Sequence, residues 1–300
     1  MNVEISVVVT SYSTEDYHYL KDCIESILCQ TFENFELIIV TENDDLKKMV
    51  SEDFDDKRIK IVDFEGSGVA EARNVGASVA KGDILSFTDD DAIVEEEWLE
   101  KIKNTYETTD CVGVSGKILP MDDEKWVRKI PEEFLWLVGL TQRGYGKKGE
   151  TVRNAYGPNM SFRKKDFDEL GGFDKKMGKI KSFMMQGEES EFSSRLRQKK
   201  GKGVIYEPDI KVYHHVEKSQ TSIKNLSKRA FYHGYSKGYM SESTFENNLE
   251  EEEVIFLKKL VFNFLPEHLT NINLRKLALS LIFSICVSVG FIYYKFASYI

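Results

Sequence analysis

The stretch Ile84-Leu85-Ser86-Phe87-Thr88-Asp89-Asp90-Asp91 decides the fold of this chain, because it joins a buried strand to a cluster of carboxylates. The apolar run from Ile84 to Phe87 is typical of a strand that is covered on both faces. In open α/β sheets ligands bind at the carboxyl ends of the strands, which is where Asp89 and Asp91 would lie. Two carboxylates at this spacing can share one divalent cation. A solvated acidic turn, or a helix start capped by Asp91, is the other interpretation.

Strand-like and helix-like segments alternate on both sides of this stretch. Strands are expected at Ile5–Val9, Phe35–Val40, Ile59–Val62, Ile84–Phe87 and Cys111–Val114, and helices at Asp16–Gln30, Gly68–Ala80 and Glu95–Thr108. Repeated strand–helix–strand units with short connections imply right-handed crossovers and a mostly parallel sheet, so the fold class is α/β. From Pro120 to Arg153 the pattern is irregular, which favours either a functional loop or an ordinary insertion.

Composition and charge narrow the class of protein. The chain has 300 residues, of which 41% are hydrophobic and 30% charged, as in globular proteins. Its net charge of −9 disfavours nonspecific binding to nucleic acid, and we expect no nucleic-acid partner. The four cysteines, Cys23, Cys29, Cys111 and Cys286, lack a metal-binding spacing. They predict reduced, structural thiols in a cytosolic compartment.

An apolar stretch near the carboxyl terminus predicts a membrane helix. Leu277–Tyr294 contains 18 residues without a charge. As a helix it would be about 27 Å long, close to the ~30 Å of a bilayer core. Arg275 and Lys276 precede the stretch and Lys295 alone follows it, a bias that places the large amino-terminal part in the cytoplasm. A buried core helix would need a partner after residue 277, so we expect a single span in the cell membrane.

Several motifs occur in the order of a known family. They are Val7–Tyr12, Gly68–Gly76 with Ala72-Arg73-Asn74-Val75-Gly76, Asp89–Asp91, Gly157–Arg163, Leu170–Asp174, Gly187–Phe192 with Arg195, and Pro208 with Val212-Tyr213-His214. Together, over residues 4–216, they resemble the family 2 glycosyltransferases. The resemblance implies the nucleotide-diphospho-sugar transferase fold, with a Rossmann-like, mostly parallel sheet. It also implies inverting, metal-dependent transfer of a sugar from a nucleotide-diphospho-sugar donor.

The same resemblance implies the acceptor and the roles of individual residues. The acceptor would be a polyprenyl-linked or other glycan, in protein N-glycosylation or a surface polysaccharide pathway. A Mg²⁺ or Mn²⁺ ion would stabilise the departing diphosphate as a Lewis acid. One carboxylate, opposite the leaving group, suffices as general base for the acceptor hydroxyl. The expected residues are Asp89, Asp91 and His214 for the metal, Thr10, Tyr12, Glu42, Arg73 and Asp89 for the nucleotide, and Glu189 with Glu188 for catalysis.

The sequence departs from the family pattern at two positions. Glu189 stands where the family usually has Asp, and Thr41-Glu42-Asn43 where it commonly has Asp-Asp or Asp-Asn. Glu42 could accept a hydrogen bond from either uracil or guanine, so the base stays open. A non-catalytic scaffold of the same fold is one alternative. A sugar-phosphate nucleotidyltransferase is another, although Thr10–Thr14 lacks the glycine-rich loop that such enzymes have.

The predicted organisation has three regions. Residues 1–217 form the catalytic domain, residues 218–274 a helical, amphipathic membrane-proximal segment, and residues 275–300 the transmembrane helix. In the middle region, basic and aromatic side chains between Ser219 and Met240 precede the amphipathic stretch Val254–Leu265. That pattern suits the interface plane of a bilayer, and a helix pair that closes the catalytic domain is the alternative.

Overall fold

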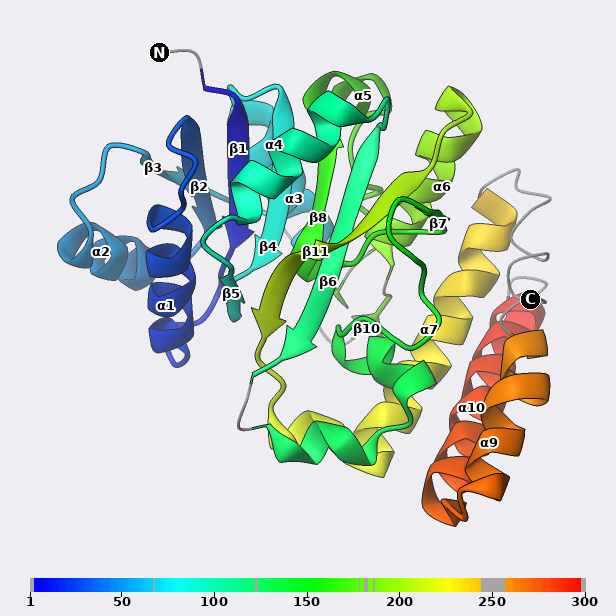
Figure 1. Ribbon diagram of the computed structural model, residues 1–300. Helices are drawn as coiled ribbons and strands as arrows, with labels where there is room; N and C mark the ends of the chain where they lie inside the picture. Colours follow the sequence, from blue (N-terminus) through cyan, green and yellow to red (C-terminus); the bar gives the residue numbers. More distant parts are fainter. Residues whose placement is uncertain are drawn as a thin grey trace.

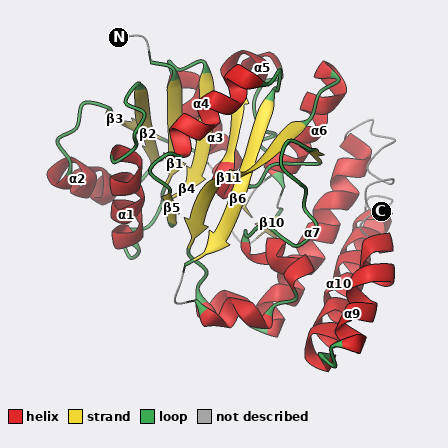
Figure 2. Cartoon of the chain, viewed as in Figure 1, coloured by secondary structure: helices red, strands yellow, loops and turns green. Residues whose placement is uncertain are grey.

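Helices pack on both faces of a central mixed sheet in the computed structural model, and a further group of helices lies beside the sheet (Figures 1 and 2). The structure describes residues 3–66, 68–121, 124–177, 179–180, 183–185, 187–243 and 257–297. The α/β fold with a mostly parallel sheet, expected from the sequence, is confirmed.

The central sheet has the strand order β3-β2-β1-β4-β8-β6-β11-β5, with β7 paired to β11. Strands β1 to β4 are parallel, β8 runs antiparallel between β4 and β6, and β11 is parallel to β6. A separate pair consists of β9 (Lys179–Ile180) and β10 (Phe183–Met184). The strands of the central sheet are β1 (Ile5–Thr10), β2 (Phe35–Thr41), β3 (Ile59–Asp63), β4 (Ile84–Asp89), β5 (Ala92–Val94), β6 (Gly113–Pro120), β7 (Thr151–Val152), β8 (Met160–Arg163) and β11 (Val204–His214).

The two faces of the sheet bury two separate apolar cores. Val7 and Val9 of β1 belong to one core and Val8 to the other, because successive side chains of a strand point to opposite faces. Residues of α1 (Tyr17–Leu28), α2 (Asp44–Asp53) and α4 (Trp98–Thr108) complete the first core. Residues of α3 (Val69–Val79), α5 (Lys164–Glu169) and α6 (Glu188–Lys200) complete the second.

Two local elements differ from the sequence expectation. Helix α2 was not predicted, and it begins where the Asn43 side chain accepts a hydrogen bond of 3.2 Å from the Leu46 amide, as an N-cap residue does. The helix expected from Glu95 starts at Trp98, because residues 92–94 form β5 and pair with β11. Tertiary pairing, not local propensity, decides the second case.

Residues 120–153 are a packed insertion. They contain the 3₁₀ helices η1 (Lys125–Lys129) and η2 (Glu132–Val138), which bury Val127, Phe134 and Leu137 in a third core. Helices α7 (Ile223–Ser243) and α10 (Leu274–Ala297) pack on the same core. The remaining elements are η3 (Gly157–Asn159), η4 (Lys218–Thr221), the π-helical turn η5 (Leu260–Phe264) and α9 (Leu265–Thr270).

Helices α7 and α10 lie side by side and run in the same direction (Figure 1). Glycines make the close approach: a Cβ on Gly234 would lie 1.9 Å from the Val287 carbonyl oxygen, and one on Gly290 1.9 Å from that of Phe231. Helix α10 therefore has a partner that precedes it in the chain. The expectation that such a partner would have to follow residue 277 was wrong.

A buried polar cluster attaches the C-terminal helices to the insertion. The Glu133 carboxylate of η2 accepts a hydrogen bond of 2.7 Å from the Ser280 hydroxyl of α10, and it lies 2.9 Å from His268 Nε2 of α9. A buried carboxylate without such partners would be strongly unfavourable. This cluster therefore fixes how α9 and α10 sit against η2.

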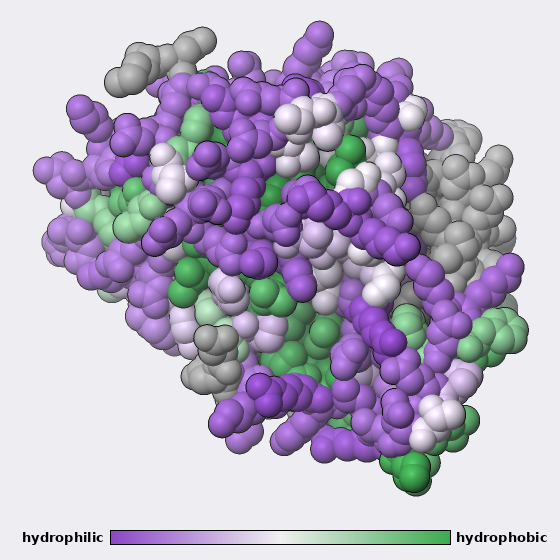
Figure 3. Space-filling model, viewed as in Figure 1, coloured by the Kyte–Doolittle hydropathy of each residue, from purple (hydrophilic) through white to green (hydrophobic). Residues whose placement is uncertain are grey.

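The face of α10 turned away from α7 is exposed and apolar. It presents Leu281, Ile285, Val289, Ile292 and Phe296. In the part of the chain that the structure describes, α10 is the one helix long and apolar enough to cross a membrane. Figure 3 shows hydrophobic surface at the lower right, where α9 and α10 meet. The amphipathic stretch expected at Val254–Leu265 is described only from Leu257 onward, and residues 254–256 lie outside the described residues.

The close packing of α7 on α10 can be tested with Gly290→Val. The new side chain would meet backbone atoms of α7, and overpacking of this kind costs roughly 1–3 kcal/mol or more. We expect the unfolding midpoint of the detergent-solubilised protein to fall by several degrees. Ser288→Val, on the exposed face of the same helix, is the control and should shift it far less. Equal midpoints for the two variants would contradict the packing.

Candidate active site

The site is assembled where several strands end. Thr10 at the end of β1 pairs in register with Val40 of β2 and with Asp89 of β4. Strand β5 follows the aspartates directly and pairs with β11, so that Ala92 lies opposite His214. The topology thus brings a histidine from residue 214 next to carboxylates from residues 89–91.

Asp89, Asp91 and His214 form a cluster that could hold a cation. One ligand atom from each of the three lies within 4.8 Å of the others. The Nε2 atom of His214 is 3.2 Å from an Asp91 oxygen and 4.0 Å from an Asp89 oxygen. Carboxylates suit Mg²⁺ and Mn²⁺, and an imidazole suits several transition metals, so this donor set can hold a divalent cation. The three residues expected as metal ligands are brought together.

The electrostatics of the cluster agree with its use for a positive ion. Burial by itself lowers the pKa of His214, but the Asp91 and Asp89 carboxylates outweigh burial and raise that pKa to about 9. Without a metal, a proton on His214 thus supplies positive charge between the two aspartates. Gly139 lies against this ring, since a Cβ there would be 3.0 Å from His214 Cε1.

Arg229 of α7 is a site residue that the sequence did not reveal. Its guanidinium donates hydrogen bonds of 2.7 Å to the Leu137 carbonyl oxygen and 3.2 Å to the Gln220 side chain. It lies near enough to the cluster for its charge to act on both Asp91 and His214. The sequence signal was only a general enrichment of basic residues in this segment, because the contact spans more than a hundred residues.

Arg73 connects the two sides of the site. It is 4% exposed, and its Nη1 donates a hydrogen bond of 2.6 Å to Glu188 while its Nη2 donates one of 2.7 Å to Asp89. Gly157 leaves room for the guanidinium, because a Cβ there would lie 2.8 Å from Nη2. The sequence suggested a contact with diphosphate or base. In the structure both Nη atoms bind carboxylates.

The residues after Arg73 explain the motif that carries it. The Asn74 side chain accepts a hydrogen bond from the Phe173 amide and donates one to the Phe173 carbonyl oxygen, each 2.8 Å long. At Gly76, a Cβ would lie 2.4 Å from the Val8 side chain, so glycine lets α3 approach β1 closely. Asn74 and Gly76 thereby fix the helix that positions Arg73.

The residues expected to bind the nucleotide lie around Tyr12. Burial raises the pKa of the Tyr12 phenol to about 12; Thr10 is its hydrogen-bond partner, and the charges of Arg73, Asp90 and Glu42 act on it. Asp89 belongs to the same group of residues, because it accepts a hydrogen bond from Arg73. The structure therefore collects Thr10, Tyr12, Glu42, Arg73 and Asp89 at one edge of the sheet.

Asp90 is an addition to this group. Its pKa is raised to about 7, mainly by burial and in smaller part by the Asp91 and Asp89 carboxylates, against a hydrogen bond with Ser11 that lowers it. The sequence pattern pointed to the alternating pair Asp89 and Asp91, and Asp90 between them was not predicted as a site residue. It lies beside Ser11 and Tyr12, among the residues that the sequence predicts for the nucleotide.

Glu188 and Glu189 begin α6 directly after Gly187, whose φ of +104° favours glycine. Glu188 is buried and bound to Arg73. The pKa of Glu189 is raised well above its ordinary value, first by burial and then by the Glu188 carboxylate next to it. Two adjacent carboxyl groups thus have different environments, which is the arrangement expected of an acid–base residue and its neighbour.

Comparison with known proteins agrees with this geometry. The family model described as glycosyl transferase family 2 matches residues 6–171. A glucosyl-dolichyl phosphate glucuronosyltransferase of Haloferax volcanii is 34% identical over an alignment 306 residues long, which covers 97% of this chain and 96% of the relative. The chain belongs to glycosyltransferase family 2. The resemblance stated from the motifs is thereby confirmed, and the protein is a glycosyltransferase.

Solved structures share the fold of this family 2 glycosyltransferase. The mannosyltransferase PcManGT of Pyrobaculum calidifontis, in complex with GDP-Man and Mn²⁺, aligns with a TM-score of 0.68 at 16% identity, over 97% of this chain and 87% of that one. TarS of S. aureus, in complex with UDP-GlcNAc, aligns with a TM-score of 0.56 at 16% identity, over 78% of this chain and 66% of that one. At these identities the likeness concerns the fold alone.

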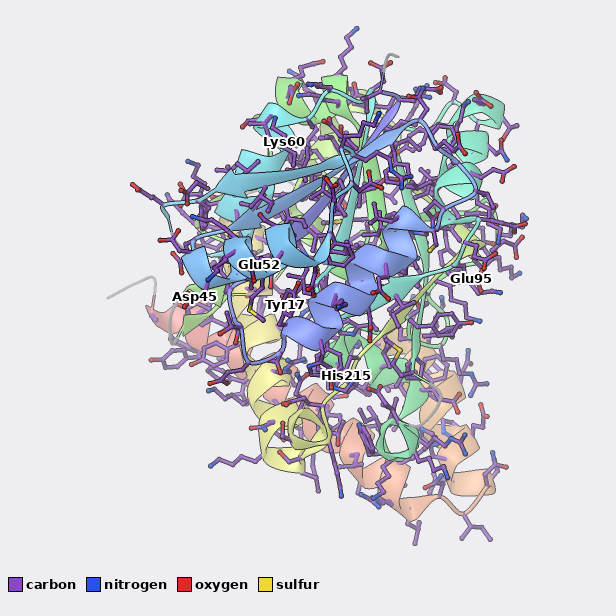
Figure 4. The ribbon with its side chains drawn as sticks, turned by 90° about the vertical axis from the view of Figure 1, so that its left-hand side faces the viewer. Tyr17, Asp45, Glu52, Lys60, Glu95 and His215 are labelled. Carbon is purple, nitrogen blue, oxygen red and sulfur yellow. The ribbon has the colours of Figure 1, made fainter. Side chains whose placement is uncertain are left out.

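His215 faces away from the cation cluster of the glycosyltransferase. Its Nδ1 is 2.6 Å from the Glu124 carboxylate, and its Nε2 is 2.9 Å from the Tyr19 hydroxyl. Figure 4 shows His215 below helix α1, which carries Tyr19. Neighbouring residues at the end of a strand point in opposite directions, so the imidazole of His214, and not that of His215, belongs to the cation cluster.

The cation cluster can be tested by Mn²⁺ titration in the presence of a nucleoside diphosphate. Since loss of a mere supporting partner typically weakens a metal site about 10–100-fold, we expect His214→Gln, which removes a ligand, to weaken Mn²⁺ binding at least about tenfold. His215→Gln is the matched control and should leave the affinity nearly unchanged. Equal effects of both variants would contradict the assignment.

Proposed function

We propose that this family 2 glycosyltransferase is an inverting, cation-dependent enzyme that transfers a sugar from a nucleotide-diphospho-sugar to a lipid-linked glycosyl acceptor. One observation carries the proposal: Arg73 binds Asp89 of the cation cluster and Glu188, the neighbour of Glu189, at the same time. The two halves of a displacement reaction, a leaving-group site and a base, therefore belong to one site.

On the donor side, Thr10, Tyr12, Glu42 and Asp90 would surround the base and ribose. Asp89, Asp91 and His214 would hold Mg²⁺ or Mn²⁺, and a bound ion would neutralise the charge that builds on the departing diphosphate. The positive charge of Arg229 lies near the same cluster and would act in the same sense. The solved relative with GDP-Man and Mn²⁺ supports this use of the fold.

On the acceptor side, Glu189 would act as general base. The acceptor oxygen forms its bond to the anomeric carbon while the bond from that carbon to the diphosphate oxygen breaks, and the hydroxyl proton passes to the Glu189 carboxylate. A single displacement of this kind inverts the configuration. Glu188, kept in place by Arg73, would add negative charge beside Glu189 and so increase its basicity.

The acceptor class comes from the relative that matches almost the whole chain. Its name states a glucosyl-dolichyl phosphate acceptor and a glucuronosyl donor group. We propose a sugar linked to a polyprenyl phosphate as the acceptor of this chain as well, in protein N-glycosylation or a surface polysaccharide pathway. UDP-glucuronic acid is then the first donor to try, with UDP-GlcNAc and GDP-mannose as comparisons.

Membrane attachment through α10 would hold the enzyme near such an acceptor. The sequence favoured a single span with the catalytic domain in the cytoplasm. The packing of α7 along α10 favours a second arrangement, in which both helices lie in the interface plane and only the outer face of α10 enters the acyl chains. Lys224, Lys228 and Arg229 of α7 would otherwise accompany α10 toward the bilayer core, where charged groups are costly.

The catalytic assignment predicts that Glu189→Gln abolishes transfer without loss of donor binding. Loss of a general base typically costs about 10²–10⁴-fold in rate, whereas Glu189 does not touch the nucleotide in the proposed arrangement. Turnover and the dissociation constant of the nucleotide with Mn²⁺ would be measured together. Asp91→Asn should instead weaken cation binding. Unchanged turnover in both variants would contradict this assignment of the site residues.

The raised pKa of Glu189 predicts the pH dependence of turnover. A general base works only when ionised, so activity should fall as pH decreases through a pKa that lies above the ordinary glutamate value. Glu188→Gln removes the neighbouring charge that raises this pKa, and the acidic limb should then move to lower pH. An acidic limb that stays in place, or moves upward, would count against Glu189 as the base.

The arrangement of α10 can be tested by cysteine labelling in sealed vesicles, in a background without the native cysteines. If α7 and α10 lie in the interface plane, Leu274→Cys and Phe296→Cys react with an impermeant maleimide from the same side. Labelling from opposite sides would establish the single span instead. Extraction at high pH would show beforehand whether the protein is membrane-bound at all.

A further inference from the structure

Strand β11 is interrupted by a bulge before it reaches the cation cluster. It pairs with β6 in two stretches, of which the first ends at Glu207 opposite Gly116 and the second begins at Lys211 opposite Lys117. Residues 208–210 are thus inserted in β11 without a counterpart in β6. A bulged strand bends, and β11 changes direction along its length (Figure 1). The bulge divides β11 into an upstream part and a downstream part.

The bulge reverses which residues of β11 face which core. In the upstream part, Val204 and Tyr206 belong to the second core. At the end of the bulge and beyond it, Ile210 and Val212 belong to the first core. All four have even numbers, and in a regular strand residues separated by an even number of positions share one face. The reversal therefore decides which side chains of the downstream part point to each face, as a shift of register does.

The downstream part carries the histidine of the cation cluster. His214 lies opposite Ala92 of β5, and Ala92 directly follows Asp91. A slip of one residue in this register would put His215 opposite Ala92 and would turn the His214 imidazole to the other face. The position of His214 beside Asp91 therefore depends on the bulge that precedes it.

One buried side chain holds the bulge in place. Asn159 is 1% exposed, and its Nδ2 donates hydrogen bonds of 3.0 Å to the Ile210 carbonyl oxygen and of 3.1 Å to the Lys117 carbonyl oxygen. Its Oδ1 accepts a hydrogen bond of 3.0 Å from the Trp98 indole. Gly116 leaves room for this amide, because a Cβ there would lie 2.1 Å from Nδ2. The amide thereby joins the bulge of β11 to the neighbouring strand β6.

Helix η3, which ends at Asn159, also contacts the strand that ends at Asp89. The Thr88 hydroxyl donates a buried hydrogen bond of 2.9 Å to the Pro158 carbonyl oxygen, and Thr88 directly precedes Asp89. The three residues of η3 therefore connect β4 with the strand that brings His214 to the cluster.

We propose that Asn159 is a positioning residue, whose amide fixes the bulge of β11 and thereby the register that brings His214 to Asp89 and Asp91. It acts through the backbone of Ile210 and touches neither the cation nor the substrates in the proposed arrangement. A primary amide suits this task, because two carbonyl groups need a donor and an indole needs an acceptor. The inference rests on the proposed function, since the cation cluster is part of it.

The first test measures the register and needs neither a metal nor turnover. In a background without the native cysteines, Ala92→Cys with His214→Cys reports on the downstream part of β11, because the two residues lie directly opposite. Thr151→Cys with Ile205→Cys reports on the upstream part in the same way. Both pairs should form a disulfide on mild oxidation. Adding Asn159→Ala should slow this reaction several-fold for the downstream pair and leave the upstream pair unchanged.

The second test measures Mn²⁺ binding to the full-length protein in detergent, with a nucleoside diphosphate present. Asn159→Ala should weaken it about 10–100-fold, as is typical when a group that orients a metal ligand is lost. Asn159→Asp should weaken it at least as much, because an ionised carboxylate only accepts hydrogen bonds. Pulsed EPR of the bound Mn²⁺ should show nitrogen coupling from the His214 imidazole in wild type and much weaker coupling in both variants.

Trp98→Phe is the control for general destabilisation. It removes the indole donor but keeps both bonds from Asn159 to the carbonyl groups. Like the Asn159 variants it should lower the unfolding midpoint, but it should leave the Mn²⁺ affinity and the nitrogen coupling nearly unchanged.

Three results would overturn the role of Asn159. The first is cross-linking of the downstream pair that Asn159→Ala leaves unchanged, or equal slowing of both pairs. The second is wild-type Mn²⁺ affinity in Asn159→Ala and Asn159→Asp. The third is an equal loss of affinity in Trp98→Phe. Wild-type protein that binds no Mn²⁺, while the cross-linking follows expectation, would contradict the cation-dependent function but not the control of the register by Asn159.

Discussion

The two hydrogen-bonded ion pairs of Arg73 are the interaction on which the site depends. A single buried guanidinium holds α3, the end of β4 and the start of α6 together through Asp89 and Glu188. Removing one partner from a buried pair leaves an uncompensated charge and costs about 3–5 kcal/mol. The arginine geometry matters here, since two nitrogens of one rigid plane reach two carboxylates at once and a lysine would offer a single point. Glycines at 157 and 76 make the space for this arrangement.

Distant parts of the chain complete what Arg73 organises. Strand β11 pairs with β5 and thereby brings His214 to Asp91. The insertion after β6 contributes Gly139 against the imidazole, and α7 contributes Arg229. The amino-terminal strands thus provide the carboxylates and the sheet edge that carries Thr10. The later segments provide the positively charged groups and the residues packed against His214. The cation cluster is a result of this second contribution.

Much of the fold follows from local sequence, because strands buried on both faces are apolar runs and need no other signal. The positions of β1 to β4 and of α1 and α3 could be predicted in this way, and the motif residues that meet at the sheet edge followed from the family pattern. The rest depends on contacts between remote segments. Pairing with β11 turned residues 92–94 into a strand, and glycines 234 and 290 matter only because α7 and α10, which are far apart in the sequence, meet there. Arg229 and the two bonds of Arg73 likewise depend on tertiary structure that no periodicity encodes.

Helix α7 serves three neighbours with three faces. Arg229 lies near the aspartates, Leu226 and Ala230 pack in the third core, and Gly234 with Gly238 forms a groove for α10. Shortening the chain before α10 would consequently uncover this groove and remove the support of α7, the helix that carries Arg229. The apolar tail is thus part of the catalytic scaffold, and trimming it for solubility would yield an altered catalyst.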